Sequence, residues 1–178
     1  KITRAAASIA AGLQKTLALG NLDAKRDWGY APEYCEGMWM ILQHSKPEDF
    51  VLATGETHTV REFVERTFDE IGIEIEWKGK RENEKGIVSK INFDKAAELL
   101  DWTNKSEKYR FKLNSSLKRG DTIVVVDPSY YRPTEVDLLI GDPSKARKLL
   151  GWKAKTKFSD LVKLMIKSDM EKVFTRGY

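Results

Sequence analysis

Short apolar strand patterns alternate with amphipathic helix patterns along this chain, and the alternation limits the folds that it can adopt. The predicted strands cover residues 16–20, 49–55, 73–77 and 122–127. Helical patterns lie around and between them, at residues 2–13, 32–43, 59–71, 142–151 and from 159 onward. Strands and helices in this order form α/β domains with some parallel strand pairing. The sequence therefore predicts an α/β fold.

Two of these elements are predicted to be buried. Residues 49–55, DFVLATG, contain a continuous apolar run that ends in glycine, which is typical of a buried strand. The helix at 32–43 carries an apolar stripe made of Tyr34, Met38, Trp39, Ile41 and Leu42. Cys35 lies among these positions, so we expect it to contribute to packing.

The character of the chain changes between residues 78 and 122. Lys, Glu, Asn and Ser dominate this segment, and it contains one short helical pattern, FDKAAELLDW. We expect a polar insertion on the surface at about residues 80–121.

Composition excludes several classes of protein. The 31 Lys and Arg exceed the 27 Asp and Glu by four, a mild and dispersed basicity that does not indicate a nucleic-acid partner. A single cysteine excludes an internal disulfide framework, and neither His44 nor His58 has a partner at metal or triad spacing. No apolar run approaches the roughly 20 residues that span a bilayer, and no signal-peptide pattern opens the chain. We expect a cytoplasmic protein with no membrane partner and no bound metal.

Two loops combine an arginine, aromatic rings and a carboxylate. Arg26 lies beside Asp27, Trp28 and Tyr30, and Arg132 lies beside Tyr130, Tyr131 and Glu135. The guanidinium fork matches phosphate oxygens, and a carboxylate can accept hydrogen bonds from ribose hydroxyls. The alternative is that each arginine forms a structural ion pair with its neighbouring acid and each aromatic fills the core. Because both loops follow predicted strands, a ligand cleft at the strand ends is the competing interpretation.

The segment ATGETHTV, residues 53–60, is a third candidate for ligand binding. A strand that ends in glycine before a helix can leave backbone N–H groups pointing at an anion. The alternative is an ordinary strand-to-helix turn in which Thr59 is the helix cap.

Several catalytic fingerprints are missing from the sequence. No GxGxxG, GxxGxxG or GxxxxGK[ST] motif follows a strand, and no Tyr-x-x-x-Lys pair occurs. The chain also starts at Lys1, without methionine and inside a helical pattern. We therefore expect a fragment with no catalytic residues of its own. If it belongs to a redox enzyme, the cofactor loop and the catalytic base precede Lys1.

Four segments of the sequence together resemble the GDP-mannose 4,6-dehydratase family. They are KITRAAASIAAGLQ, LGNLDAKRDWGYAPEY, PEDFVLATGETHTVREFVE and VDPSYYRPTEVDLLIGDPSKARKLLGW. The run from Gly20 to Gly29 is specific to that family, which belongs to the extended short-chain dehydrogenase/reductases. The resemblance covers the chain apart from residues 80–121. It implies that residues 1–178 form the C-terminal substrate-binding portion of a Rossmann-type fold, without the N-terminal NADP-binding domain.

The resemblance also implies roles for particular residues. Arg26 and Arg132 would contact the diphosphate of GDP-mannose, and Glu135 would contact the ribose. Lys1, Gly20, Asn21 and Lys25 would lie near the guanine or its phosphates. NADP would be bound mainly by the N-terminal domain, and the full-length protein would be a homodimer or homotetramer.

Two other functions are compatible with these residues. One is a GDP-sugar epimerase or reductase of the same superfamily, which differs mainly in the upstream catalytic residues. The other is a non-catalytic module that binds a nucleotide sugar and has lost the cofactor domain.

Overall fold

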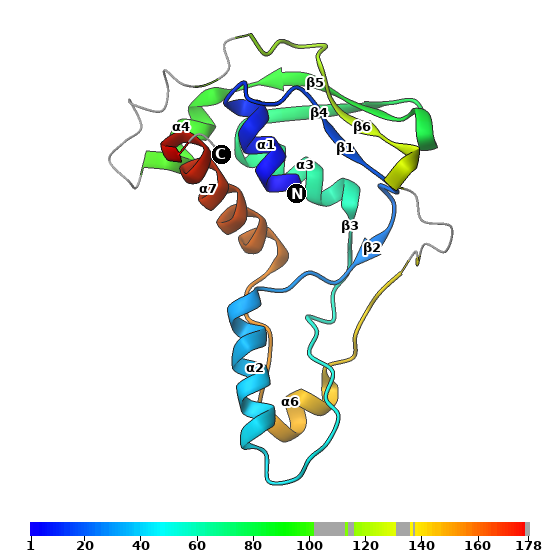
Figure 1. Cartoon of the computed structure of the whole chain (residues 1–178), viewed down its shortest axis with the longest axis vertical. Coiled ribbons are helices and arrows are strands. Elements are labelled where there is room, and N and C mark those ends of the chain that lie inside the picture. Colours follow the sequence, from blue (N-terminus) through cyan, green and yellow to red (C-terminus); the bar gives the residue numbers. More distant parts are fainter. Residues whose placement is uncertain (102–112, 114–115, 131–135, 137, 177–178) are drawn as a thin grey trace. The chain divides into compact units, whose positions relative to one another are not determined.

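The computed structural model describes residues 1–101, 113, 116–130, 136 and 138–176 (Figure 1). The chain divides into two compact units. Unit 1 comprises residues 1–22, 61–135 and 162–178, and unit 2 comprises residues 23–60 and 136–161.

A four-stranded sheet forms the centre of unit 1, with strand order β1, β6, β5, β4 (Figure 1). These strands are β1 (Leu17–Leu19), β4 (Ile73–Lys78), β5 (Lys85–Ile91) and β6 (Thr122–Val126). Strands β1 and β6 pair in parallel, whereas β6 with β5 and β5 with β4 pair antiparallel. The predicted strands at 16–20, 73–77 and 122–127 and the expected parallel pairing are confirmed.

The helices that lie wholly or mostly in unit 1 supply the rest of its core. They are α1 (Ile2–Ala10), α3 (Val60–Glu70), α4 (Phe93–Asp101) and α7 (Phe158–Arg176), with short 3-10 turns at η1 (Arg81–Asn83) and η2 (Pro128–Tyr130). Helix α3 buries Phe63, Val64, Thr67 and Phe68, the i, i+1, i+4, i+5 spacing of one helical face. The chain leaves α3 at Gly72, whose φ of 75° is accessible to glycine at little cost.

The segment at 80–121 is not confined to the surface. Strand β5 is an inner strand of the sheet, with partners on both sides, and its Val88 is 1% exposed. In α4, Ala96 and Leu100 are also buried. The expected surface location is therefore wrong for β5 and for the buried face of α4, which belong to the sheet and the core. That the segment at 80–121 is an insertion relative to other proteins stays a prediction.

Unit 2 contains little regular structure besides two helices. Strand β2 (Lys25–Arg26) pairs antiparallel with β3 (His58–Thr59), and the helices are α2 (Ala31–Gln43) and α6 (Ser144–Leu150). A parallel bridge joins Lys25 to Leu138. Helix α6 ends at Gly151, as predicted, in the left-handed conformation with a φ of 71°.

The predicted buried strand at 49–55 is wrong. This segment forms no strand, and the side chain of Val51 is 52% exposed. A strand requires a hydrogen-bonded neighbour, and none pairs with this segment in the part of the chain that the structure describes. An apolar run alone does not supply that neighbour.

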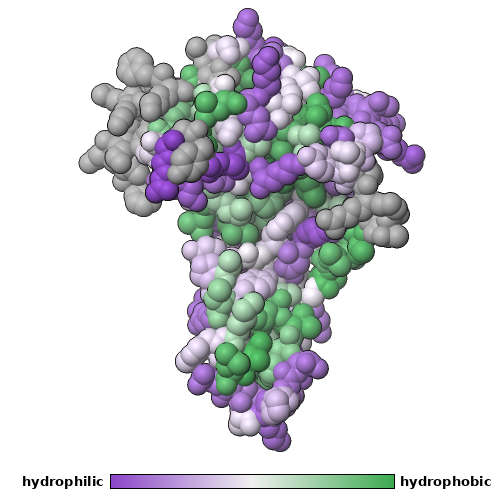
Figure 2. Space-filling view, viewed as in Figure 1, coloured by the Kyte–Doolittle hydropathy of each residue, from purple (hydrophilic) through white to green (hydrophobic). Residues whose placement is uncertain are grey.

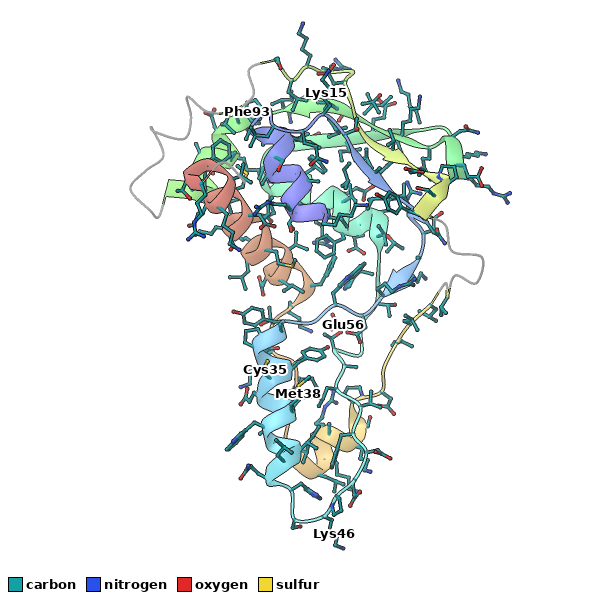
Figure 3. The ribbon with its side chains drawn as sticks, viewed as in Figure 1. Lys15, Cys35, Met38, Lys46, Glu56 and Phe93 are labelled. Atoms are coloured by element: carbon teal, nitrogen blue, oxygen red, sulfur yellow. The ribbon has the colours of Figure 1, made fainter. Side chains whose placement is uncertain are left out.

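The apolar stripe of α2 is helical but largely exposed. Met38, Trp39 and Leu42 are 58%, 61% and 80% exposed, whereas the buried residue of α2 is Gly37. Cys35 is an exposed free thiol, which overturns the expected packing role, and it projects with Met38 from α2 (Figure 3). Figure 2 shows apolar side chains reaching the molecular surface. Among the described residues, no helix is long and apolar enough to cross a membrane.

Candidate nucleotide-sugar site

The carboxyl ends of the parallel strands β1 and β6 carry one group of predicted site residues. Gly20 directly follows β1, and the loop from Asp127 to Tyr130 directly follows β6. The backbone N–H of Asp127 donates to the carbonyl of Leu19 at 2.8 Å, which joins the two strand ends. Ligands of α/β folds commonly bind at such carboxyl ends.

Gly20 permits a close approach between these two loops. A Cβ atom at this position would lie 2.6 Å from the carbonyl oxygen of Tyr130, a distance that real Cβ contacts do not show. Only glycine therefore fits without displacing the backbone of η2. Asn21 follows Gly20 and is half-buried.

Lys1 brings a positive charge to the same strand ends. Its ammonium lies 3.6 Å from the centroid of the Tyr130 ring, within cation–π range. The backbone N–H of Ser129 donates to the Asp127 carboxylate at 2.9 Å. This hydrogen bond lowers the pKa of Asp127, and the charge of Lys1 lowers it further. The ionised carboxylate of Asp127, in the loop after β6, and the ammonium of Lys1 thus lie close together.

Lys25 and Arg26 lie in unit 2, on strand β2. In the register with β3, Lys25 faces Thr59 and Arg26 faces His58. One guanidinium nitrogen of Arg26, Nη1, donates to the carbonyl of Val136 at 2.7 Å and to that of Lys25 at 2.8 Å. These two bonds orient the guanidinium.

Asp27 binds the turn that we considered as an anion cradle. Its Oδ1 accepts hydrogen bonds from the N–H of Thr54 at 3.1 Å and from the Thr54 hydroxyl at 2.7 Å. Its Oδ2 accepts from the N–H of Gly55 at 2.9 Å. The backbone donors of Thr54 and Gly55 therefore bind a carboxylate of the chain itself, and the binding of a ligand anion at residues 53–60 stays a prediction. These three bonds favour a structural role for Asp27 over the interpretation in which it accepts ribose hydroxyls.

Trp28 of the first loop packs against another ring of unit 2, as do Tyr34 and His58 nearby in the sequence or the sheet. Trp28 stacks on Phe158 with ring centroids 5.6 Å apart, and His58 stacks on Phe158 at 3.9 Å with an interplanar angle of 9°. Tyr34 meets Trp152 edge to face at 5.5 Å. The stacking of Trp28 favours the packing interpretation for that residue. Local spacing could not reveal these contacts, because the partners are 100 or more positions apart in the sequence.

Glu33 is a structural residue that the sequence analysis missed. Its carboxylate accepts hydrogen bonds from the hydroxyl of Thr156 at 2.7 Å and from the N–H groups of Thr156 and Lys155 at 3.0 Å. Its backbone carbonyl accepts from the indole N–H of Trp152 at 2.7 Å. These bonds tie the first turn of α2 to the segment after α6.

The predicted site residues thus fall into three groups. Lys1, Gly20 and Asn21 lie in unit 1, and Lys25 and Arg26 lie in unit 2. Arg132 and Glu135 lie outside the described residues, so the convergence of Arg26 and Arg132 on one diphosphate stays a prediction. Within the described ranges, no group of three His, Cys, Asp or Glu side chains could hold a metal ion.

Solved structures with a similar fold include nucleotide-binding enzymes. The structure of RMD from Pseudomonas aeruginosa complexed with NADPH matches 97% of this chain and 41% of its own, with a TM-score of 0.59 and 15% identity. UDP-glucose 4-epimerase from Bifidobacterium longum, in complex with NAD+ and UDP, matches 100% and 41%, with a TM-score of 0.56 and 16% identity. At these identities the likeness concerns the fold alone, and it agrees with the expected α/β class.

Curated relatives are much more similar in sequence. The GDP-mannose 4,6 dehydratase of Dictyostelium discoideum is 49% identical over 96% of this chain and 40% of its own length. The enzymes of that name from Sinorhizobium fredii and Homo sapiens are 48% and 46% identical, over 99% and 96% of this chain. The chain spans 38% to 42% of the length of these three relatives. The model of the family described as GDP-mannose 4,6 dehydratase matches residues 1–165, and the chain therefore belongs to that family.

Proposed function

We propose that the full-length protein is a lyase that converts GDP-mannose to GDP-4-keto-6-deoxymannose, and that this chain supplies substrate recognition. The observation that carries the proposal is the 45% to 49% identity, over almost the whole chain, to relatives named for that reaction. The same identity favours a dehydratase over a GDP-sugar epimerase or reductase and over a non-catalytic binding module. The family membership and the shared fold add support.

The nicotinamide cofactor belongs to another part of the proposed enzyme. The sequence contains no glycine-rich dinucleotide motif after a strand, so the residues of this chain do not form such a site by themselves. When bound to the full-length protein, NADP would supply reversible hydride acceptance from the sugar. The contribution of this chain is to bind and orient the nucleotide, so that the sugar reaches the reacting groups.

Recognition of the GDP group is assigned to the predicted site residues. Arg26 and Arg132 would hold the diphosphate and Glu135 the ribose, while Lys1, Gly20, Asn21 and Lys25 would lie near the guanine or its phosphates. The fixed guanidinium of Arg26 supports its part in this assignment, because arginine binds phosphate oxygens through a rigid fork of donors. The ammonium of Lys1 and the close approach at Gly20 support the part assigned to the ends of β1 and β6.

Turnover by the full-length protein tests the reaction directly. We expect GDP-mannose, incubated with NADP and the enzyme, to lose one water, as detected by mass spectrometry of the nucleotide sugar. A protein that instead epimerises or reduces a GDP sugar without dehydration would contradict the proposal. A protein that binds GDP-mannose and leaves it unchanged would favour the non-catalytic module.

A substitution at Arg132 tests the assignment of the diphosphate contact. We expect Arg132→Ala to raise the KM for GDP-mannose by about tenfold or more, which corresponds to about 1.4 kcal/mol. Arg119→Ala, which removes an exposed arginine, is the matched control and should leave KM unchanged. An equal KM in the two variants would remove Arg132 from the site.

A further inference from the structure

We infer that Asp27 is a positioning residue for Arg26: its carboxylate anchors the end of β2 to the turn at Thr54 and Gly55, and this anchor fixes where the Arg26 guanidinium lies. The inference rests on the proposed function, because it gives Arg26 the diphosphate of a nucleotide sugar as its ligand. All the contacts that carry it belong to unit 2.

The Asp27 carboxylate binds a segment that is distant in sequence, and both of its oxygens accept hydrogen bonds there. Three hydrogen bonds from Thr54 and Gly55 reach it at 2.7 to 3.1 Å, across 27 and 28 positions of the chain. Hydrogen bonds to an ionised acceptor are stronger than neutral ones, and two backbone donors leave little freedom of direction. The group therefore fixes the relative position of two loops of unit 2.

Arg26 depends on this anchor through the backbone. Adjacent residues of an extended chain point to opposite sides, so the Asp27 side chain can bind Thr54 while the Arg26 side chain extends toward Val136. The pairing of β2 with β3 comprises only the pairs Lys25–Thr59 and Arg26–His58, so it holds Arg26 at the end of a short strand. The pairing and the bridge from Lys25 to Leu138 hold the chain up to Arg26, and the Asp27 anchor holds it directly after Arg26.

The alternative role of Asp27, as a ligand of the substrate, fits the geometry less well. All three of the donors that reach its carboxylate belong to Thr54 and Gly55, so the group faces that turn. We therefore assign Asp27 an effect on the ligand that acts through Arg26.

A double-mutant cycle in the full-length protein tests this coupling. The measured quantity is the Kd for GDP, obtained by calorimetry in the absence of turnover, for the wild type, Arg26→Ala, Asp27→Ala and the double variant. We expect each single variant to weaken GDP binding by about tenfold, and the double variant to bind no more than about threefold more weakly than Arg26→Ala. Independent effects, which would multiply to about 100-fold, would overturn the inference.

If Asp27→Ala fails to fold, a variant that removes only one of the three hydrogen bonds to Asp27 can replace it in the test. Thr54→Val removes the hydroxyl donor while preserving the shape of the side chain. It should weaken GDP binding by about threefold in the wild-type background and have no effect beside Arg26→Ala. An equal loss in both backgrounds would count against the coupling.

The control is Asp49→Ala, which removes an exposed carboxylate of the same unit and should leave the Kd unchanged in both backgrounds.

The inference and the proposed function can fail separately. A protein that binds GDP with the expected coupling but does not dehydrate GDP-mannose keeps the inference and loses the proposed reaction. If the protein dehydrates GDP-mannose but Asp27→Ala binds GDP with the wild-type Kd, the proposed reaction stands and the inference is wrong. If the wild type does not bind GDP, both are wrong.

Discussion

Two glycines of unit 1 separate the cost of backbone strain from the cost of steric overlap. Gly72 and Gly120 both have positive φ, at 75° and 95°. A Cβ at Gly72 would lie 1.8 Å from the carbonyl oxygen of Asn92, whereas a Cβ at Gly120 would have no neighbour within 4 Å. The two positions therefore share the strain but differ in the available space.

We expect alanine to be much more costly at Gly72 than at Gly120. Gly120→Ala should lower the free energy of unfolding by about 1 kcal/mol, the cost of a left-handed alanine. Gly72→Ala should cost a further 1 to 3 kcal/mol or so, because the backbone of Asn92, which donates to the Gly72 carbonyl at 2.7 Å, must also move. Urea denaturation of both variants measures the difference. Equal losses would show that the chain relaxes around the methyl group at no cost.

At the same scale, the site shows what local sequence can and cannot indicate. The arginine, the glycine and the aromatics of the loop at Gly20 to Tyr34 could be selected from their chemistry and spacing. The bonds from Thr54 to Asp27 and the stacking of Trp28 on Phe158 could not, because both depend on contacts between distant positions. Chemistry therefore identified candidate residues, and only the fold separated an anchor such as Asp27 from a candidate ligand such as Arg26.

At the scale of elements, strand β5 shows how pairing outweighs local pattern. Its few apolar residues lie among Lys, Gly and Ser in a polar stretch of the chain, so the sequence indicated a surface segment. Pairing on both sides places it inside the sheet and buries Val88. The segment at 49–55 is the opposite case, since it has a stronger apolar run and no partner among the described strands. Strands 16–20, 73–77 and 122–127 were predictable because pattern and pairing agree there.

The same valine-to-alanine change in these two segments tests this difference. Val88→Ala should lower the free energy of unfolding by about 2 kcal/mol, because it removes buried methyl groups and leaves a cavity. Val51→Ala should change it by less than about 0.5 kcal/mol, because that side chain is already 52% exposed. Chemical denaturation followed by circular dichroism provides both values. A larger loss at Val51 than at Val88 would contradict the burial of β5.

At the scale of the whole molecule, the apolar core is divided unequally between the two units. The largest fully buried side chains among the described residues, such as Phe68, Ile123 and Met170, all belong to unit 1. Unit 2 exposes large apolar side chains, including Trp39 and Leu42. Since apolar burial is the main favourable contribution to folding, unit 1 should hold most of the stability of the chain.

Hydrogen exchange of the 178-residue chain should reveal this imbalance. We expect the amides of β5, β6 and the buried turns of α3 to exchange only through the largest unfolding events, and those of α2 and α6 to exchange through smaller local openings. The reason is that α2 buries Gly37 and α6 buries Ala146, whereas α3 alone buries two phenylalanines, Phe63 and Phe68. Mass spectrometry of exchange at increasing denaturant separates the two classes of opening. Equal protection of α2 and α3 would mean that the two units unfold as one, and that the exposed apolar face of α2 does not weaken its unit.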